Sequence, residues 1–423
     1  MKFDTAIIGG GLSGLVAGIR LVRQNQKCVI ISSGQSALHF FSGSFDLLNF
    51  LPDGSAAVKN PTKEIRNLIQ QAPEHPYSKI GAEKFIDLAK KSEDFLTDIN
   101  IKFQGSAKIN HFRITPLGFF KPTWLTLSDF VVSENENKPS WNSVSIFNIE
   151  GFLDFQPEFV AESFNKMGIR TEIHDINLPE LNRIRRNPSE FRSVNLTVVL
   201  DKPEIQNTLA QIFKEKSKNS EVIIFPACLG FESNEILPKL SEKIGKPVYL
   251  LPTLPPSLVG IRTQKHLQDY FKKSGGELML GDNVMSGEFE DSRLTRIYTQ
   301  NHGDIPIVAD NFILAGGSFF SQGLIADIDH VYEPIFNLDV EFSPEREKWY
   351  NPNFFETQNY QKFGVKTDGD FKALKRNQPV ENLYVSGAIL SGFNPIKEGC
   401  GGGVSLLSAL SVSEKILNIE ETK

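Results

Sequence analysis

The chain has 423 residues, with 45 Lys or Arg against 51 Asp or Glu and a formal net charge of −6. Apolar residues make up 40% and charged residues 23%, which excludes global disorder, and the mild acidity argues against a nucleic-acid-binding protein. The three cysteines, Cys28, Cys228 and Cys400, are too few and too widely spaced for a disulfide framework or a four-thiolate iron–sulfur cluster. We expect two to four domains, a reducing environment and no metal site.

No segment has the pattern of a membrane-spanning helix. The most apolar stretch, residues 5–22, contains five glycines and Arg20, whereas a spanning helix needs about 20 apolar residues and tolerates charge poorly. We therefore expect any membrane association to be peripheral or to occur through a partner.

The amino-terminal segment predicts a nucleotide-binding β–turn–α–β unit. Residues 3–8 are β-prone, residues 9–14 are Gly-Gly-Gly-Leu-Ser-Gly, and apolar residues then recur at helical spacing up to Val22. A second apolar run follows at residues 28–31. Because strand, GxGxxG turn, helix and strand occur in this order, the glycine motif indicates nucleotide or flavin binding.

Each glycine of the motif has its own expected part in this unit. Gly9 permits the tight turn, Gly11 lets the backbone approach a phosphate, and Gly14 allows the helix to pack closely on the strand. The free N–H groups at the helix start favour the negative charge of the phosphate.

The acidic residue that normally binds the ribose about 20 residues later is missing, since Ser32, Ser33 and Gly34 occupy those positions. Two interpretations remain open. In one, Ser32 or Ser33 replaces the carboxylate with a weaker hydrogen bond. In the other, no adenosine ribose is bound and the ligand is a mononucleotide.

The middle of the chain predicts an inserted α/β unit. Two strand–helix–strand patterns occur there, at residues 144–147, 158–166 and 171–176, and at residues 222–225, 235–244 and 248–251.

The remaining glycine turns predict further parts of the nucleotide-binding domain. A meander of strands is expected at residues 277–280, 284–289 and 294–300. Two later strands end in glycine turns at Gly316 and Gly387, and Gly401, Gly402 and Gly403 directly precede a helix at residues 404–416. Such a helix start can face the pyrimidine part of a flavin, where reduction builds negative charge.

We therefore expect an α/β fold: a discontinuous, Rossmann-like FAD/NAD(P)-binding-type flavoprotein fold with an inserted α/β cap domain. The expected division of the chain is a flavin-binding domain in three parts, a large cap insertion and a second cap segment. In chain order these are 1–55 (flavin), 56–245 (cap), 246–325 (flavin), 326–378 (second cap segment) and 379–423 (flavin).

Five segments resemble one family, the B subunit of the anaerobic glycerol-3-phosphate dehydrogenase. They are FDTAIIGGGLSGL from Phe3, GQSALHFFSGSFDLL from Gly34, LPTLPPSLVGIR from Leu251, LAGGSFFSQGL from Leu314 and ENLYVSGAILSGFNPIKEGCGGG from Glu381. The resemblance spans nearly the whole chain and implies an FMN flavoprotein, with FAD as the alternative. The implied partners are a catalytic FAD subunit (the A subunit) and an iron–sulfur subunit (the C subunit), which anchors the complex to the cytoplasmic face of the inner membrane.

The resemblance also implies an activity. The complex oxidises sn-glycerol 3-phosphate to dihydroxyacetone phosphate and passes electrons to quinone, with fumarate or nitrate as terminal acceptor. The family's substrate site is usually placed on the catalytic partner, so this chain could be an electron relay or carry a second site. Two other hypotheses stay open: a stand-alone FAD enzyme of the fumarate-reductase or ketosteroid-dehydrogenase type, and a non-catalytic assembly subunit.

Candidate site residues follow from these motifs. The expected cofactor contacts all belong to glycine turns or to serines after the second strand: Gly9, Gly11, Gly14, Ser32, Ser33, Ser36, Ser42, Gly316, Gly387, Gly401, Gly402 and Gly403. His39 is a candidate for proton transfer near the flavin, against a structural histidine, and Lys397 is a candidate for stabilising the reduced flavin, against a solvated lysine. Arg262, with its bidentate fork, and Thr253 are candidates for substrate binding.

Overall fold

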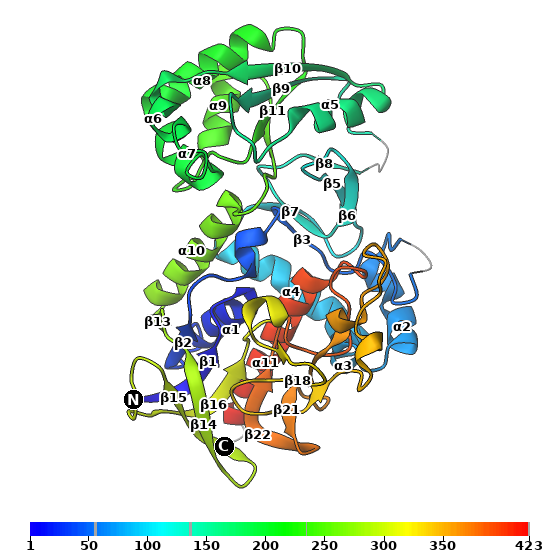
Figure 1. The fold of residues 1–423 in the computed structure, drawn as a ribbon, viewed down its shortest axis with the longest axis vertical. Helices are drawn as coiled ribbons and strands as arrows, with labels where there is room; N and C mark the ends of the chain where they lie inside the picture. The colour runs from blue at the N-terminus through cyan, green and yellow to red at the C-terminus, as the bar shows by residue number, and fades with distance from the viewer. Residues whose placement is uncertain (55–56, 135–137, 234, 422–423) are drawn as a thin grey trace.

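The computed structural model describes residues 1–54, 57–134, 138–233 and 235–421, with side chains described up to residue 417. Figure 1 shows two bodies along the long axis, a larger one that contains both chain ends and a smaller one at the opposite end.

The larger body is built on an eight-stranded sheet with strands from three separate parts of the chain. Its order is β13-β2-β1-β16-β15-β14, and β22 pairs with β16 and β21. The bounds are β1 Lys2–Ile8, β2 Cys28–Ser32, β13 Glu277–Leu280, β14 Val284–Glu290, β15 Arg293–Thr299, β16 Ile307–Leu314, β21 Lys372–Lys375 and β22 Gln378–Val385. The core pairs β2–β1–β16–β22 are parallel, so their carboxyl ends meet at one edge.

Three helices cover this sheet: α1 (Leu12–Val22), α10 (Leu258–Lys273) and α11 (Gly401–Glu421). Both α10 and α11 pack against α1, which is buried along nearly its whole length. This explains why the α1 sequence LSGLVAGIRLV is apolar on almost every side, as expected for a helix enclosed between neighbours. The expected discontinuous, Rossmann-like α/β architecture is confirmed.

The smaller body contains the parallel sheet β10-β9-β11-β12. The two expected strand–helix–strand units are both present, as β9–α5–β10 and β11–α9–β12. The bounds are β9 Ser143–Ile149, α5 Pro157–Lys166, β10 Arg170–Ile176, β11 Val222–Pro226, α9 Ile236–Ile244 and β12 Val248–Leu251. Helices α6 (Asn182–Arg185), α7 (Ser193–Leu200) and α8 (Pro203–Lys216) complete this cap.

Two small antiparallel sheets lie between the bodies in Figure 1. One has the order β3-β7-β4 and the other β6-β5-β8. Their strands are β3 Ser44–Phe45, β4 Phe103–Gly105, β5 His111–Ile114, β6 Phe120–Thr123, β7 Leu125–Leu127 and β8 Val132–Ser133.

Some elements lie elsewhere than the expected division places them. Helices α2 (Pro61–Gln71), α3 (Pro76–Ile80) and α4 (Ala82–Asp98) fall within the range expected for the cap, yet α3 and α4 pack on α11 and α2 packs on α4.

The expected meander is wrong at its first strand: β13 pairs in parallel with β2, and only β14, β15 and β16 are consecutive and antiparallel. An apolar run does not specify which strand it will pair with, so the sequence left the neighbour of β13 in the sheet undetermined.

The segment between β16 and β21 contains only short elements. Its strands are β17 Ile325–Ala326, β18 Val331–Tyr332, β19 Val340–Glu341 and β20 Gly364–Val365, and its 3-10 helices are η3 Phe319–Ser321, η4 Arg346–Lys348 and η5 Asn359–Lys362. Among the described residues, no helix combines the length and the apolar character needed to cross a membrane.

Candidate functional site

A cavity of about 750 Å³ lies along the carboxyl edge of the parallel strands. Its wall includes four segments far apart in sequence: the glycine turn 9–13, the end of β2 with the loop after it, the turn 314–317, and the start of α11 at Gly401 and Gly402. The carboxyl edge of such a sheet is where open α/β folds bind nucleotides.

The glycine turn has the shape that a bound phosphate needs. A Cβ atom on Gly9, whose φ is +115°, would lie 2.2 Å from the Ala315 carbonyl oxygen, and one on Gly14 would lie 2.0 Å from the Gly9 carbonyl oxygen. A Cβ on Gly11 would meet nothing closer than the Ser36 Cβ, at 3.7 Å. Gly9 and Gly14 are therefore required by the packing of the protein itself, whereas the space beside Gly11 is open cavity.

The start of α11 forms the opposite end of the cavity. Gly401 and Gly402 line it together with Ser44, Phe45 and Asp46. The first N–H groups of a helix have no intrahelical partner and carry a partial positive charge. This end therefore suits a ligand group that gains negative charge.

Gly403, the third glycine of the run, has a different role. A Cβ there would lie 2.3 Å from the Tyr77 hydroxyl oxygen, and the residue is buried away from the cavity. Its N–H donates to the Asp46 carbonyl oxygen at 2.8 Å, which fixes the α11 start against the segment after β3.

The other end of the cavity is bounded by Ser32, Ser33 and the segment 282–285. Ser32 accepts a hydrogen bond from the Gly34 N–H at 3.3 Å. Asp282, the carboxylate at this end, already accepts bonds from the Asn283 and Asn301 N–H groups and contacts His302. Among the described residues at this end of the cavity, Ser32 and Ser33 offer hydroxyl groups, and the Asp282 carboxylate is already engaged by protein groups.

The structure brings most of the expected cofactor residues to this one cavity. Gly9, Gly11, Ser32, Ser33, Ser36, Gly316, Gly401 and Gly402 all line it. Gly387 lies between two lining residues, Ser386 and Ala388, and packs against Ser13. Ser42 is not part of the wall.

The expected catalytic and substrate residues are not brought to the cavity. His39 is half-buried outside its wall, and burial lowers the pKa of this imidazole. Lys397 lies beside Gly54. Arg262 forms a buried ion pair with Asp129 at 2.7 Å and donates to the Gly230 carbonyl oxygen, and Thr253 is buried outside the cavity wall.

Sequence reasoning missed several cavity residues, including Asp46, Ser44, Glu333 and Ser405. Glu333 is buried, which raises its pKa, and its carboxylate accepts hydrogen bonds from the N–H groups of Ile335 and Phe336. Ser44 and Asp46 lie within the family-like segment that begins at Gly34, but no spacing pattern singles them out, and Glu333 and Ser405 lie outside the family-like segments.

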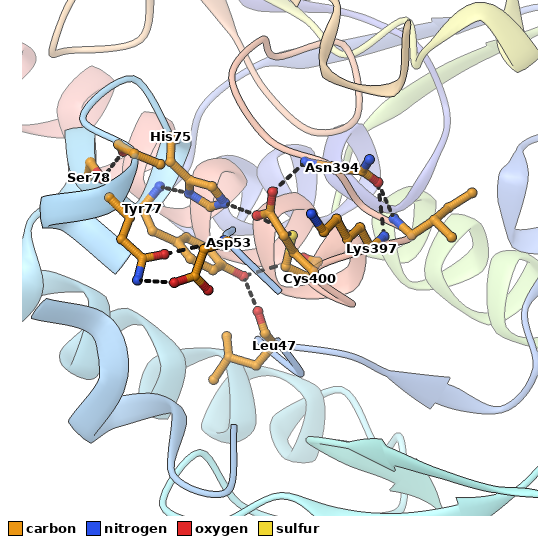
Figure 2. A network of polar contacts seen from close by, with 12 residues as sticks. Leu47, Asp53, His75, Tyr77, Ser78, Asn394, Lys397 and Cys400 are labelled. Carbon is orange, nitrogen blue, oxygen red and sulfur yellow. Dashed lines mark hydrogen bonds and ion pairs between the residues drawn. The ribbon is translucent and has the colours of Figure 1, made fainter. Parts of the chain in front are cut away.

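Directly before α11, a buried polar network holds the loop in place (Figure 2). The His75 Nε2 lies 3.0 Å from the Glu398 carboxylate, whose other oxygen accepts the Asn394 N–H at 2.9 Å. Cys400 lies beside Glu398, and burial raises the pKa of its thiol well above the usual value. The Tyr77 hydroxyl donates to the Leu47 carbonyl oxygen at 2.7 Å.

The three side chains His75, Glu398 and Cys400 are close enough together to hold a metal ion. However, the His75 Nδ1 accepts the Tyr77 N–H at 2.9 Å, so the proton of the neutral ring sits on Nε2 and donates to Glu398. A metal at Nε2 would require an imidazolate. The donor set therefore favours a structural hydrogen-bond network over a metal centre.

Comparisons with known proteins agree with this geometry. The sequence pattern of the family described as FAD binding domain matches residues 4–404. The chain is 48% identical over 422 residues to the B subunit of the anaerobic glycerol-3-phosphate dehydrogenase of Yersinia enterocolitica, covering 100% of this chain and 99% of that protein. Its identity to the protein of the same name from Pectobacterium atrosepticum is 44%, over 99% of both chains.

Among solved structures, the chain is similar to a 3-ketosteroid Δ1-dehydrogenase from Sterolibacterium denitrificans. The TM-score is 0.47 at 10% identity, covering 99% of this chain and 100% of that one.

Proposed function

Because this chain belongs to the FAD binding domain family and, within it, to the family of the B subunit of anaerobic glycerol-3-phosphate dehydrogenase, we propose that it binds a flavin along its cavity as a redox subunit of that complex. The observation that carries the proposal is the convergence of the glycine turn, the Gly316 turn and the α11 start on one cavity. Three segments so far apart in the sequence have no other evident reason to present bare backbone to the same space.

We propose FAD as the flavin. The cavity continues past Gly11 to Ser33 and the segment 282–285, on the side where an adenosine would lie. FMN, implied by the resemblance, has one observation in its favour, namely the lack of a free carboxylate for the adenosine ribose. A serine hydroxyl can supply a weaker hydrogen bond there, and the extra space supports the proposal of FAD.

This chain's own residues bind and orient the cofactor. The open side of Gly11 and the first N–H groups of α1 receive phosphate, and the α11 start at Gly401 and Gly402 faces the ring system. The bound isoalloxazine supplies two-electron chemistry, and the positive end of α11 favours the charge that its reduction produces.

We further propose the assembly and reaction implied by the family. The complex oxidises sn-glycerol 3-phosphate to dihydroxyacetone phosphate with quinone as electron acceptor, in company with a catalytic FAD subunit and a membrane-anchoring iron–sulfur subunit. The chain would then lie at the cytoplasmic face of the inner membrane through its partners. Its own part is oxidation at its flavin or transfer of electrons to the next centre.

The test is gentle purification of the tagged chain from its native host, followed by absorbance spectroscopy and mass analysis of the released cofactor. The expected result is a yellow complex with partner proteins, quinone reduction on addition of glycerol 3-phosphate, and FAD released from this chain. Released FMN would overturn the FAD assignment. Colourless chain from an intact, active complex would overturn flavin binding and leave an assembly role.

A further inference from the structure

Two exposed aromatic rings meet beside the flavin cavity. The rings of Phe40 and Phe320 lie edge to face with their centroids 4.8 Å apart, and the two residues are 54% and 62% exposed. The cavity wall includes residues 37–38 and 41 on the side of Phe40, and residues 321–323 on the side of Phe320. The ring pair therefore stands at the rim of the cavity, on the surface of the molecule.

The aromatic surface continues away from the cavity. Phe319, next to Phe320 in the chain, has its ring centroid 6.1 Å from that of Tyr360. The Tyr360 N–H donates to the Trp349 carbonyl oxygen at 2.8 Å, which brings Tyr350 to the same region. Tyr360 is 40% exposed and Tyr350 is 56% exposed. These exposed rings therefore belong to one surface and are not scattered singly.

The loop 351–358 adds two more phenylalanines to this surface. Phe354 and Phe355 are 82% and 93% exposed, yet the loop has hydrogen bonds of its own. The Gln358 side chain accepts from the Asn351 N–H at 2.9 Å and donates to the Asn351 carbonyl oxygen at 3.2 Å. The loop thus holds both rings in water. We define the aromatic face as Phe40, Phe320, Tyr350, Phe354, Phe355 and Tyr360.

A contiguous exposed apolar surface of this kind marks an interaction site, whereas single exposed apolar residues need no explanation. Aromatic side chains are also the residues that interfaces between proteins favour as anchors. The aromatic face is therefore a docking surface, and its charges indicate the occupant.

The segments around the aromatic face are acidic. Residues 327–329 and 345–362 contain five carboxylates against three basic side chains. Of these bases, Lys348 pairs with Glu345 at 2.6 Å, and Arg346 donates to two backbone carbonyl oxygens. Within the part of the chain that the structure describes, four exposed carboxylates here form no ion pair: Asp327, Asp329, Glu347 and Glu356.

This acidic rim separates three kinds of occupant. An anionic lipid surface attracts basic segments and repels an acidic one. A second copy of this chain, docked by two-fold symmetry, would bring two acidic rims together. A different protein with Lys and Arg around an apolar centre has the complementary charge.

We propose that the aromatic face docks a second, different protein chain, whose own docking face is apolar at its centre and carries Lys and Arg around it. The proposal rests on the proposed function for the position of the flavin. Because the aromatic face begins at the rim of the cavity, the docked chain lies beside the flavin. It also shields that side of the cavity from water.

The experiment starts from the intact complex, purified gently from the native host through a tag on this chain. The partner chains are identified by mass analysis, and each is titrated against the isolated wild-type chain and its variants. The double variant Phe320→Ser with Phe355→Ser is expected to weaken binding of one partner by at least about 30-fold, since two aromatic anchors are lost. The matched control, Leu153→Ser, removes a 67% exposed apolar side chain from the cap and should change the affinity by less than about 2-fold.

A second variant tests the charges without touching the rings. Glu347→Lys with Glu356→Lys is expected to weaken binding about 10-fold at low salt and less at high salt, because added ions screen exposed charges. Unchanged or tighter binding by this variant contradicts the acidic rim as the basis for choosing the partner.

All these side chains are exposed, so the isolated variants should keep the flavin content and the unfolding midpoint of the wild type. Unchanged partner affinity in the folded aromatic variant overturns the proposal, and so does a wild-type chain that purifies without a partner. Binding of the wild type to vesicles of anionic phospholipid, or its self-association, overturns it as well if the aromatic variant abolishes that binding. A colourless chain in the intact complex would overturn the proposed function alone, since the partner titration still tests the aromatic face.

Discussion

At the scale of single residues, the three glycines of the first turn have different physical duties. The neighbours of Gly9 and Gly14 exclude any side chain, and those neighbours are backbone atoms of the protein itself. Only Gly11 adjoins open cavity, with φ −82° and ψ −172°, a conformation that every L-residue can adopt. Substitutions at these positions therefore separate loss of fold from loss of ligand.

We predict that Gly11→Val leaves the unfolding midpoint of the flavin-free protein within about 2 °C and abolishes flavin retention, because the new side chain occupies the phosphate position. Gly14→Ala serves as the matched change. It is expected to lower the midpoint of the flavin-free protein, since its Cβ would collide with the Gly9 carbonyl. Differential scanning fluorimetry and flavin absorbance measure both, and stoichiometric flavin in Gly11→Val would refute the phosphate assignment.

A second prediction at this scale concerns pH. Burial lowers the pKa of His111 to about 4, against an ordinary value of 6.5, although Asp46 acts in the opposite direction. On acidification, the unfolded chain therefore takes up a proton before the folded protein does. The stability that depends on the neutral ring is complete above about pH 6.5 and is lost between pH 6.5 and 4.

Between pH 7 and pH 5, this one group is expected to cost about 2 kcal/mol of unfolding free energy. Urea unfolding at both pH values should show that loss in the wild type and a correspondingly smaller one in His111→Asn. An equal pH dependence in both proteins would show that His111 titrates normally in the fold.

At the scale of elements, the start of α11 depends on the loop before it. That loop is fixed by the Glu398 carboxylate, which accepts from the His75 Nε2 and the Asn394 N–H, and by Gly403 bonded to Asp46. Because Gly401 and Gly402 line the cavity, the position of this loop sets the position of the helix end that faces the ligand (Figure 2).

We predict that Glu398→Ala lowers the free energy of unfolding by about 2–4 kcal/mol, since it leaves two buried donors without an acceptor. It should also weaken flavin binding about 10-fold by loosening the α11 start. Glu398→Gln is expected to recover only part, because an amide N–H would face the Nε2–H of His75. Urea unfolding and flavin fluorescence titration measure these effects, and the exposed neighbour change Ile396→Ser should affect neither.

At the scale of the whole molecule, the cap is attached to the flavin domain through α10. Arg262, in the second turn of this helix, binds the Asp129 carboxylate in the loop between β7 and β8. It also donates to the Gly230 carbonyl oxygen in the cap loop between β11 and α9. The Asp129 carbonyl in turn accepts the Leu250 N–H of β12. The ion pair is buried, with side chains 11% and 8% exposed.

We predict that Arg262→Met destabilises the protein by about 3–5 kcal/mol, because Asp129 is left buried and unpaired. Adding Asp129→Leu should recover most of this loss. As a comparison, Lys265→Met breaks an exposed pair with Glu232 and should cost less than about 1 kcal/mol. Urea unfolding of the four proteins tests this, and an equal cost for the two single variants would contradict the buried-pair interpretation.

The sequence by itself determined the elements that depend on local pattern. The glycine turn between β1 and α1, both strand–helix–strand units of the cap and the carboxyl-terminal helix are all present, although that helix begins at Gly401 and not after the glycine run. Apolar periodicity and glycine spacing constrain the chain within about 30 residues. The long motifs also predicted the family correctly.

Only the tertiary structure decided which side chains meet. It showed that Arg262 is paired with Asp129 and that His39 and Lys397 lie outside the cavity wall. It also placed Asp46 at the cavity with the α11 start and in contact with Lys121 of β6. Pairings between residues 46 and 121 or 75 and 398 leave no trace in local periodicity. They exist because the parallel sheet gathers strands from both ends of the chain at one edge, and the cavity forms where those ends meet.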